Sequence, residues 1–137
     1  MQTSFEIATR GPGLHEFTRE AAAWVAGQGD GLLTLLVQHT SASLLIQENA
    51  DPDVQADLLG FLDRLAPPSD HPSMAWLKHT LEGPDDMPAH IKAAVLPISL
   101  QVPVAQGRLR LGTWQGLYLV EHRTAPHTRR IAAHFGA

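Results

Sequence analysis

One twelve-residue stretch, EGPDDMPAHIKA from Glu82 to Ala93, concentrates side chains that could bind a metal or a phosphate. It contains Glu82, Asp85, Asp86, His90 and Lys92. His79 stands three residues before Glu82, so a helical turn there would place both side chains on one face. Imidazoles and carboxylates around an open position are what a divalent metal needs to bind substrate or water. The stretch is therefore a candidate for one wall of a catalytic site.

A helix cap explains part of the same stretch. Asp85 or Asp86 can accept hydrogen bonds from the free N–H groups of a helix that has Pro88 in its first turn. The spacing from His79 to His90 matches no standard zinc pattern. His90 and Lys92 would lie about 200° apart around this helix. We expect His90 to face the site and Lys92 to face water.

Two further segments carry polar side chains within apolar runs. In QHTSAS, His39 is followed by Thr40 and Ser41, whose hydroxyls can bind phosphate oxygens or orient the imidazole ring. A single histidine there is more often a hydrogen-bonded core residue than a ligand. In LVEHR, an extended strand would place Glu121 and Arg123 on one face. Arginine suits a bidentate phosphate grip, but this pair also fits an ordinary surface ion pair.

The acidic residues of ENADPDVQAD have a simple structural interpretation. Asp51 is a candidate helix cap before Pro52, and Asp53 is favoured in the first turn by the helix dipole. Asp57 is explained less well, because it is an i, i+4 neighbour of Asp53 with the same charge. Capping is the preferred interpretation, and cation binding that extends to Glu48 and Asn49 is the alternative.

The elements that must position these residues alternate between strands and helices. Period-two patterns predict strands in SFEIATR, ISLQVPV, RLRLGTW and LYLVEHR, with RRIAAHF as a further strand. The stretch LLTLLVQHTSASLLIQEN is β-rich, with an apolar run on each side of a polar break. Apolar stripes and turn residues predict helices in TREAAAWV, with Thr18 as its cap, in DPDVQADLLGFLDRL, and in DDMPAHIKAAVL. We expect one α+β domain, residues 1–137, that is mostly antiparallel and sandwich-like with about three helices packed on one side.

Composition narrows the classes of protein. The chain has 137 residues, 44% of them hydrophobic, which suits one domain with a real core. A net charge of −4 with scattered Lys and Arg argues against nucleic-acid or anionic-membrane binding. The chain has no cysteine, which excludes disulfides and thiolate chemistry. No signal-peptide pattern or membrane-length apolar run is seen, so we expect a cytoplasmic protein.

Four motifs resemble one known family. HTSASLLIQENADPDV, EGPDDMPAHIKA, LGTWQGLYLVEHR and the late RRI occur in the same order and spacing as in the YjbQ family of small bacterial and archaeal proteins. The resemblance covers nearly the whole chain. It implies a β-sandwich-like α+β domain that assembles as a homotrimer. It also implies secondary thiamine-phosphate synthase activity, which joins a pyrimidine pyrophosphate to a thiazole phosphate and releases pyrophosphate.

The resemblance also selects candidate site residues. Those lying in the matching motifs are His39, Thr40, Ser41, Glu48, Asn49, Asp51, His79, Glu82, Asp85, Asp86, His90, Lys92, Gln115, Glu121, His122 and Arg123. Their chemistry suggests three roles. The catalytic candidates are His39, Glu82, His90 and Arg123. The candidates for binding substrate phosphate are Thr40, Ser41, Asn49, Lys92, Gln115 and Arg123. The candidate metal ligands are His39, His79, His90 and Asp86, with magnesium and zinc both considered.

Two other functions fit the same residues. A zinc-type metal that activates water would make the protein a hydrolase of a phosphorylated small molecule. A trimer that captures a phosphorylated metabolite without turnover is the third interpretation. We expect His39, His79, Glu82, His90 and Arg123 to approach one shared cleft.

Overall fold

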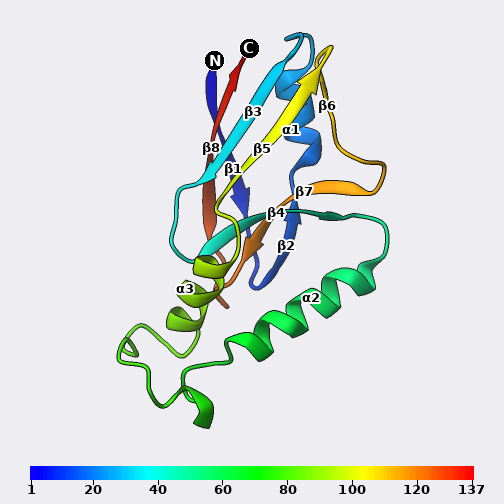
Figure 1. Cartoon of the computed structure of the whole chain (residues 1–137). Coiled ribbons are helices and arrows are strands. Elements are labelled where there is room, and N and C mark those ends of the chain that lie inside the picture. Colours follow the sequence, from blue (N-terminus) through cyan, green and yellow to red (C-terminus); the bar gives the residue numbers. More distant parts are fainter.

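The computed structural model describes all residues 1–137 and has the expected α+β architecture (Figure 1). Its elements are β1 (Gln2–Ala8), β2 (Gly13–Glu16), α1 (Thr18–Val25), β3 (Gly31–Val37), β4 (Ala42–Glu48), α2 (Pro52–Leu65), a 3-10 turn η1 (Pro72–Met74), α3 (Asp86–Val95), β5 (Ser99–Ala105), β6 (Arg108–Leu109), β7 (Gln115–Glu121) and β8 (Thr128–Gly136). None of the helices is long and apolar enough to span a membrane.

The strands form two antiparallel sheets. The larger sheet has the order β1-β8-β3-β5-β6, and the smaller has the order β2-β7-β4. β8 pairs with both β1 and β3, so the last strand is internal. The N-terminal and C-terminal strands are therefore neighbours, and both termini lie at the same end of the molecule (Figure 1). In the smaller sheet, β4 and β7 pair with Ala42 opposite Glu121, which brings the QHTSAS and LVEHR motifs together at one end of that sheet, away from the termini (Figure 1).

The core lies between the two sheets and α1. In β3, the side chains of Leu33, Leu35 and Val37 point inward and are almost fully buried. Leu117 and Leu119 of β7 pack into the same cluster. The opposite face of the larger sheet is open to solvent, because Leu32 and Leu36 of β3 are 37% and 44% exposed. Alternation thus places the core on one face of this sheet.

The helices differ in how they begin. Asp51 caps α2 as expected, since its side chain accepts a hydrogen bond from the Asp53 N–H at 2.9 Å. The prediction that Thr18 caps α1 is wrong: Thr18 is the first helical residue, and its hydroxyl donates to Glu16 at 2.7 Å. The same Thr18 oxygen accepts from the Leu117 N–H at 2.9 Å, which ties α1 to β7.

The start of α3 also differs from expectation. Asp85 occupies the cap position, but its side chain makes no capping hydrogen bond, and Asp86 is already inside the helix. Lys92 is only 9% exposed and its Nζ lies 2.9 Å from Oδ1 of Asp63, so the expectation that it faces water is wrong. The long Lys stem is covered while its ammonium reaches the carboxylate of α2. Because neither Asp85 nor Asp86 makes a capping hydrogen bond, both carboxylates are free to bind other partners.

Candidate metal and phosphate site

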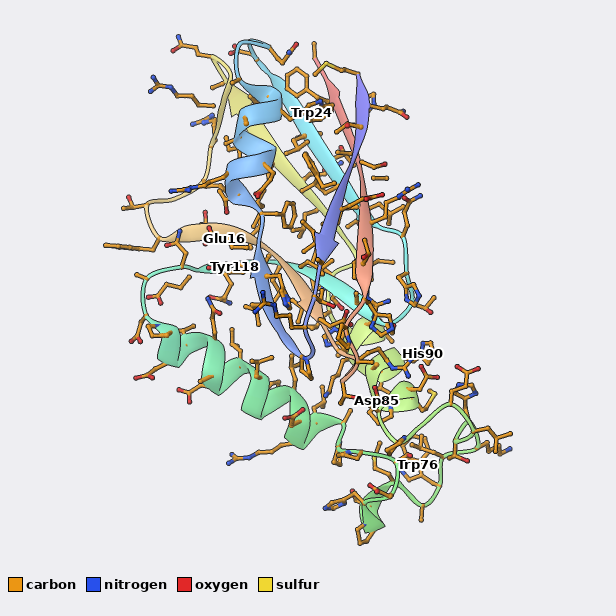
Figure 2. The ribbon with its side chains drawn as sticks, turned by 180° about the vertical axis from the view of Figure 1, so that it is seen from behind. Glu16, Trp24, Trp76, Asp85, His90 and Tyr118 are labelled. Carbon is orange, nitrogen blue, oxygen red and sulfur yellow. The ribbon has the colours of Figure 1, made fainter.

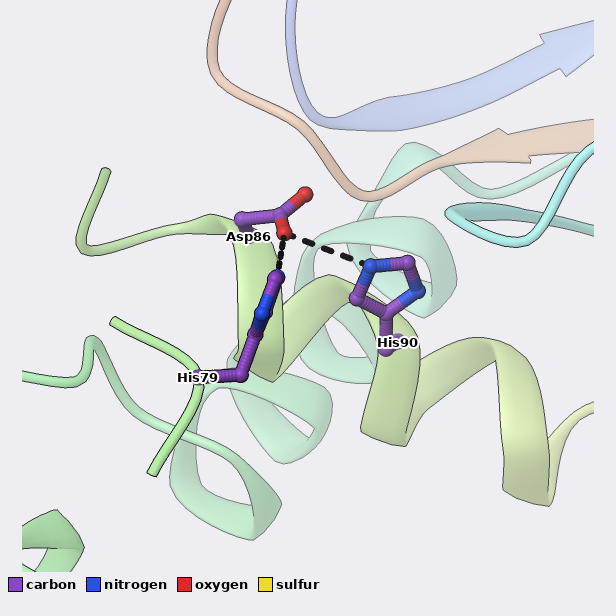
Figure 3. Close-up of side chains that lie close together, drawn as sticks. All are labelled: His79, Asp86 and His90. Carbon is purple, nitrogen blue, oxygen red and sulfur yellow. Dashed lines mark hydrogen bonds and ion pairs between the residues drawn. The ribbon is translucent and has the colours of Figure 1, made fainter. Parts of the chain in front are cut away.

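Asp86, His90 and His79 bring three potential metal-ligand atoms together at the start of α3 (Figure 3). Asp86 and His90 are one helical turn apart, and the chain before α3 folds back so that His79 reaches the same point. The Nε2 atoms of His79 and His90 lie 2.7 and 3.3 Å from Oδ2 of Asp86. All three ligand atoms lie within 4.8 Å of one another. Such a spacing suits a single divalent cation.

A hydrogen bond to the backbone of Thr40 fixes the orientation of the His90 ring. Its Nδ1 lies 3.0 Å from the carbonyl oxygen of Thr40, which can only accept, so Nδ1 carries the hydrogen. In the neutral ring, the Nε2 lone pair then faces the Asp86 carboxylate. Two lone pairs at this distance repel unless a proton or a metal ion lies between them. A backbone carbonyl that orients the far ring nitrogen is typical of histidines that bind metals.

Arg123 fixes the carboxylates on the other side of the site. Its Nη1 donates to Oδ1 of Asp86 at 2.7 Å and its Nε donates to Oδ2 of Asp85 at 2.8 Å. Its Nη2 donates to the carbonyl oxygen of Glu82 at 3.3 Å. All three guanidinium nitrogens therefore donate to protein oxygens. This arrangement fits a residue that positions Asp86 better than a residue that binds a phosphate.

The local charges keep both aspartates ionised. Burial opposes ionisation of Asp85, but hydrogen bonds from Arg123 and the Thr124 N–H outweigh it and lower the pKa of Asp85 to about 2. Burial likewise opposes ionisation of Asp86, but the hydrogen bond from His79 and the nearby His90 and Arg123 lower its pKa. Asp86 is therefore an ionised carboxylate that is only 2% exposed.

The site is open on one side and its donors favour particular metals. The side chain of Asp86 is covered, whereas those of His79 and His90 are 47% and 31% exposed. Glu82 lies farther out, with Oε2 3.9 Å from His79 Nε2. Two imidazoles and one carboxylate suit zinc and related first-row metals, whereas magnesium prefers oxygen ligands. The residues fit a catalytic zinc-type site, which keeps a coordination position free.

Two hollows flank the three residues. One, of about 320 Å³, is lined by Trp76, Leu77, Lys78, His79 and Met87 and is mostly apolar. The other, of about 250 Å³, is lined by His39, Thr40, His90, Ala93, Ala94 and Ile98. Trp76, Asp85 and His90 lie at one end of the molecule, far from Trp24 at the other (Figure 2). A bound ion would therefore lie between an apolar hollow and a hollow that contains His39.

The structure brings most, but not all, of the predicted site residues to this end. His39 shares a hollow with His90 but is not among the three clustered metal-ligand side chains. Thr40 contributes its carbonyl oxygen, and Ser41 is 1% exposed behind His39. Lys92 is on α3 but its ammonium turns to Asp63.

Asn49 and Gln115 lie elsewhere. The paired strands β4 and β7 place Ala42 opposite Glu121 at one end and Glu48 opposite Gln115 at the other. Seven extended residues span roughly 20 Å. Gln115 accepts a hydrogen bond from the Gly112 N–H and lines a separate hollow beside α1. The structure therefore does not place Asn49 and Gln115 with the three clustered residues in one chain.

A buried ion pair behind the site was not expected from the sequence. Arg129 of β8 is 2% exposed, and its Nε and Nη2 donate to the two carboxylate oxygens of Glu121 at 2.8 and 2.6 Å. Thr9 donates to the same carboxylate at 2.7 Å. Glu121 therefore pairs with Arg129 and not with the guanidinium of Arg123. The available signal was that Arg129 shares the inward face of β8 with Ile131, Ala133 and Phe135.

Comparisons with known proteins show the family of this chain. Residues 3–136 match the family model described as UPF0047 protein YjbQ-like. A UPF0047 protein of Synechocystis is 49% identical over 93% of this chain and 86% of its own. The UPF0047 protein YjbQ of Salmonella typhimurium is 44% identical over 96% of this chain and 94% of its own.

Solved structures show the same fold. A conserved hypothetical protein from Thermus thermophilus is similar with a TM-score of 0.84 and 35% identity, covering 98% of this chain and 99% of its own. A hypothetical protein from Aeropyrum pernix has a TM-score of 0.85 and 28% identity, covering 100% and 98%. The chain belongs to the YjbQ/UPF0047 family.

Proposed function

We propose that the protein is a metal-dependent enzyme that acts on a phosphorylated small molecule. The observation that carries this proposal is the meeting of His79, Asp86 and His90, with ligand atoms within 4.8 Å and one side open to solvent. A divalent ion held there would neutralise phosphate charge and act as a Lewis acid. Binding that only captured a metabolite would not require two oriented imidazoles around a buried carboxylate.

The specific reaction we propose is the one that the family resemblance implies. A pyrimidine pyrophosphate and a thiazole phosphate would be joined, and pyrophosphate would be released. The hollow beside His79 supports a ring-bearing substrate, because Trp76 is 68% exposed and the lining includes Leu77 and Met87. A planar heterocycle can stack on an indole while its phosphate reaches the cation. Lys78 lines the same hollow and adds positive charge.

Hydrolysis is the second candidate, and the donor set favours it. Two imidazoles and a carboxylate suit a zinc-type ion, and zinc sites of this kind commonly activate water. Transfer and hydrolysis would use the same phosphate-binding site and would differ in the acceptor. An assay can therefore distinguish the two reactions by supplying or omitting the thiazole phosphate acceptor.

The test is an assay of metal-loaded protein with pyrimidine pyrophosphate, with and without thiazole phosphate. Formation of thiamine phosphate with equimolar pyrophosphate supports transfer, whereas release of pyrophosphate or phosphate without thiazole phosphate supports hydrolysis. His90→Ala should lose bound metal, measured by elemental analysis, and should lose activity. Asp57→Ala, which removes an exposed carboxylate of α2, should keep both. Full metal content and activity in His90→Ala would overturn the proposal.

A further inference from the structure

His39 has one ring nitrogen that is committed to protein donors. It lies in the turn between β3 and β4, where its Nδ1 accepts a hydrogen bond from the Ser41 backbone N–H at 3.1 Å. The Ser41 hydroxyl oxygen lies 3.0 Å from the same nitrogen. A backbone N–H cannot reverse its direction, so Nδ1 must remain an acceptor. The hydrogen of the neutral ring then resides on Nε2.

The Ser41 hydroxyl is itself held in the donating orientation. Its oxygen accepts a hydrogen bond from Nη2 of Arg129 at 3.0 Å, and arginine can only donate. The hydroxyl hydrogen is therefore free to point at His39 Nδ1. Arg129 in turn is anchored by two hydrogen bonds to the fully buried Glu121. The buried ion pair thus sets the polarity of the contact between Ser41 and His39.

The free nitrogen of His39 has no protein partner. No hydrogen bond within the chain involves Nε2, and the ring lines the hollow of about 250 Å³ that His90 also lines. Partial burial and the charge of Arg129 lower the pKa of His39, which favours the neutral ring. The Nε2–H is accordingly a donor without an acceptor, next to the proposed metal ligands.

We infer that His39 is a fixed N–H donor to an anionic phosphate oxygen of the substrate and is not a metal ligand. Its Nδ1 lone pair is occupied, and its Nε2 bears a hydrogen, so neither nitrogen offers a lone pair to a metal. Ser41, Arg129 and Glu121 are positioning residues that act through His39. The identity of the acceptor rests on the proposed function, whereas the tautomer rests only on the hydrogen bonds described above.

The tautomer can be measured directly on the metal-free protein. Two-bond ¹H–¹⁵N correlation spectra at neutral pH should show His39 with a protonated Nε2 and an unprotonated Nδ1. Ser41→Ala removes the hydroxyl but keeps the backbone donor, so the tautomer should remain while the Nδ1 resonance shifts. A protonated Nδ1 in the wild-type protein would overturn the inference, whatever the enzyme's activity.

The ligand is tested with inorganic phosphate as the probe and zinc-loaded protein. A hydrogen bond to a charged group is stronger than one between neutral groups, so His39→Leu should weaken phosphate binding by about tenfold or more. His39→Gln places an amide N–H near the position of Nε2 and should recover most of the affinity. Zinc content should equal that of the wild type in both variants.

The outcomes separate this inference from the proposed function. Loss of zinc in His39→Leu would make His39 a ligand and overturn the inference while leaving a metal site in place. Phosphate affinity unchanged in His39→Leu would overturn it as well. If wild-type protein binds no zinc, the proposed function fails, and the spectra of the metal-free protein still decide the tautomer.

Discussion

Arg123 and Asp86 are 37 residues apart in sequence, yet Nη1 of one lies 2.7 Å from Oδ1 of the other. This hydrogen bond joins the segment after β7 to the first turn of α3. It occupies one carboxylate oxygen and leaves the other, Oδ2, between the two histidines. Arg123 therefore fixes the direction in which Asp86 presents its free oxygen, a supporting role typical of residues around metal sites.

Replacing Arg123 should weaken metal binding without removing a ligand. Arg123→Ala leaves Oδ1 of the buried Asp86 without its hydrogen-bond donor, so we expect a loss of about 1–3 kcal/mol in unfolding free energy. We also expect metal affinity to fall by about 10–100-fold, as it does when other residues that hydrogen-bond to metal ligands are replaced. Titration calorimetry and urea unfolding measure the two effects. Arg64→Ala, which removes an exposed arginine near the end of α2, is the control and should change neither.

The fold was predictable where local patterns decide it. Alternation identified the strand around Val102 and Val104, and Asp51 followed by Pro52 identified the start of α2. The position of β8 was not predictable in the same way, because strand order depends on pairing between segments distant in sequence. β6 is only Arg108–Leu109, shorter than the alternation of RLRLGTW predicts.

In the candidate site too, the features set by local geometry were predictable from the sequence, and those set by contacts between distant segments were not. Asp86 and His90 are one turn apart on a helix, so their proximity follows from helical geometry. The addition of His79 depends on a loop that no periodicity describes. Lys92 and Arg129 were harder still, since a charged side chain is usually exposed. Each is buried because a carboxylate from a distant element, Asp63 or Glu121, meets it.

The stability of the protein should fall in mild acid because of His122. Burial and the charge of Lys92 lower the pKa of His122 from 6.5 to about 4, and its Nε2 lies 2.8 Å from the Ser43 hydroxyl oxygen. Between these values the unfolded chain binds a proton that the folded protein does not, so stability falls as pH falls. The slope should be roughly 1 kcal/mol per pH unit.

His122→Gln isolates this contribution. The amide can still meet the Ser43 hydroxyl but does not titrate, so the unfolding free energy should depend less on pH between about pH 6.5 and pH 4. Urea unfolding at several pH values gives the two slopes. Equal slopes in the variant and the wild type would assign the acid sensitivity to other groups.

The cap of α2 should contribute measurably to stability. Asp51→Ala removes the acceptor of the Asp53 N–H, and we expect a loss of about 0.5–2 kcal/mol. Asp57→Ala changes an exposed aspartate in the same helix and is the matched control, with an expected change within about 0.5 kcal/mol. Denaturant midpoints compare the two. A loss in Asp57→Ala as large as in Asp51→Ala would point to overall charge and not to the cap.

We propose, finally, that the protein assembles as a homotrimer, as the family resemblance implies. The outer face of the larger sheet supports assembly, because Leu32 and Leu36 are 37% and 44% exposed there and lie on the internal strand β3. Covering these exposed leucines with a second copy of the chain would remove apolar surface from water, which favours association. Light scattering should give about three times the monomer mass of 14.9 kDa.

The contribution of this face is tested by Leu36→Glu. A charge there would be desolvated in an interface, so the variant should dissociate towards monomers while its circular dichroism remains that of the folded protein. Leu65→Glu, at the end of α2, alters a leucine with a similar exposed fraction of 46% and should keep the assembly. A monomeric wild type at micromolar concentration would contradict the trimer. A trimer that persists in Leu36→Glu would place the interface on another face.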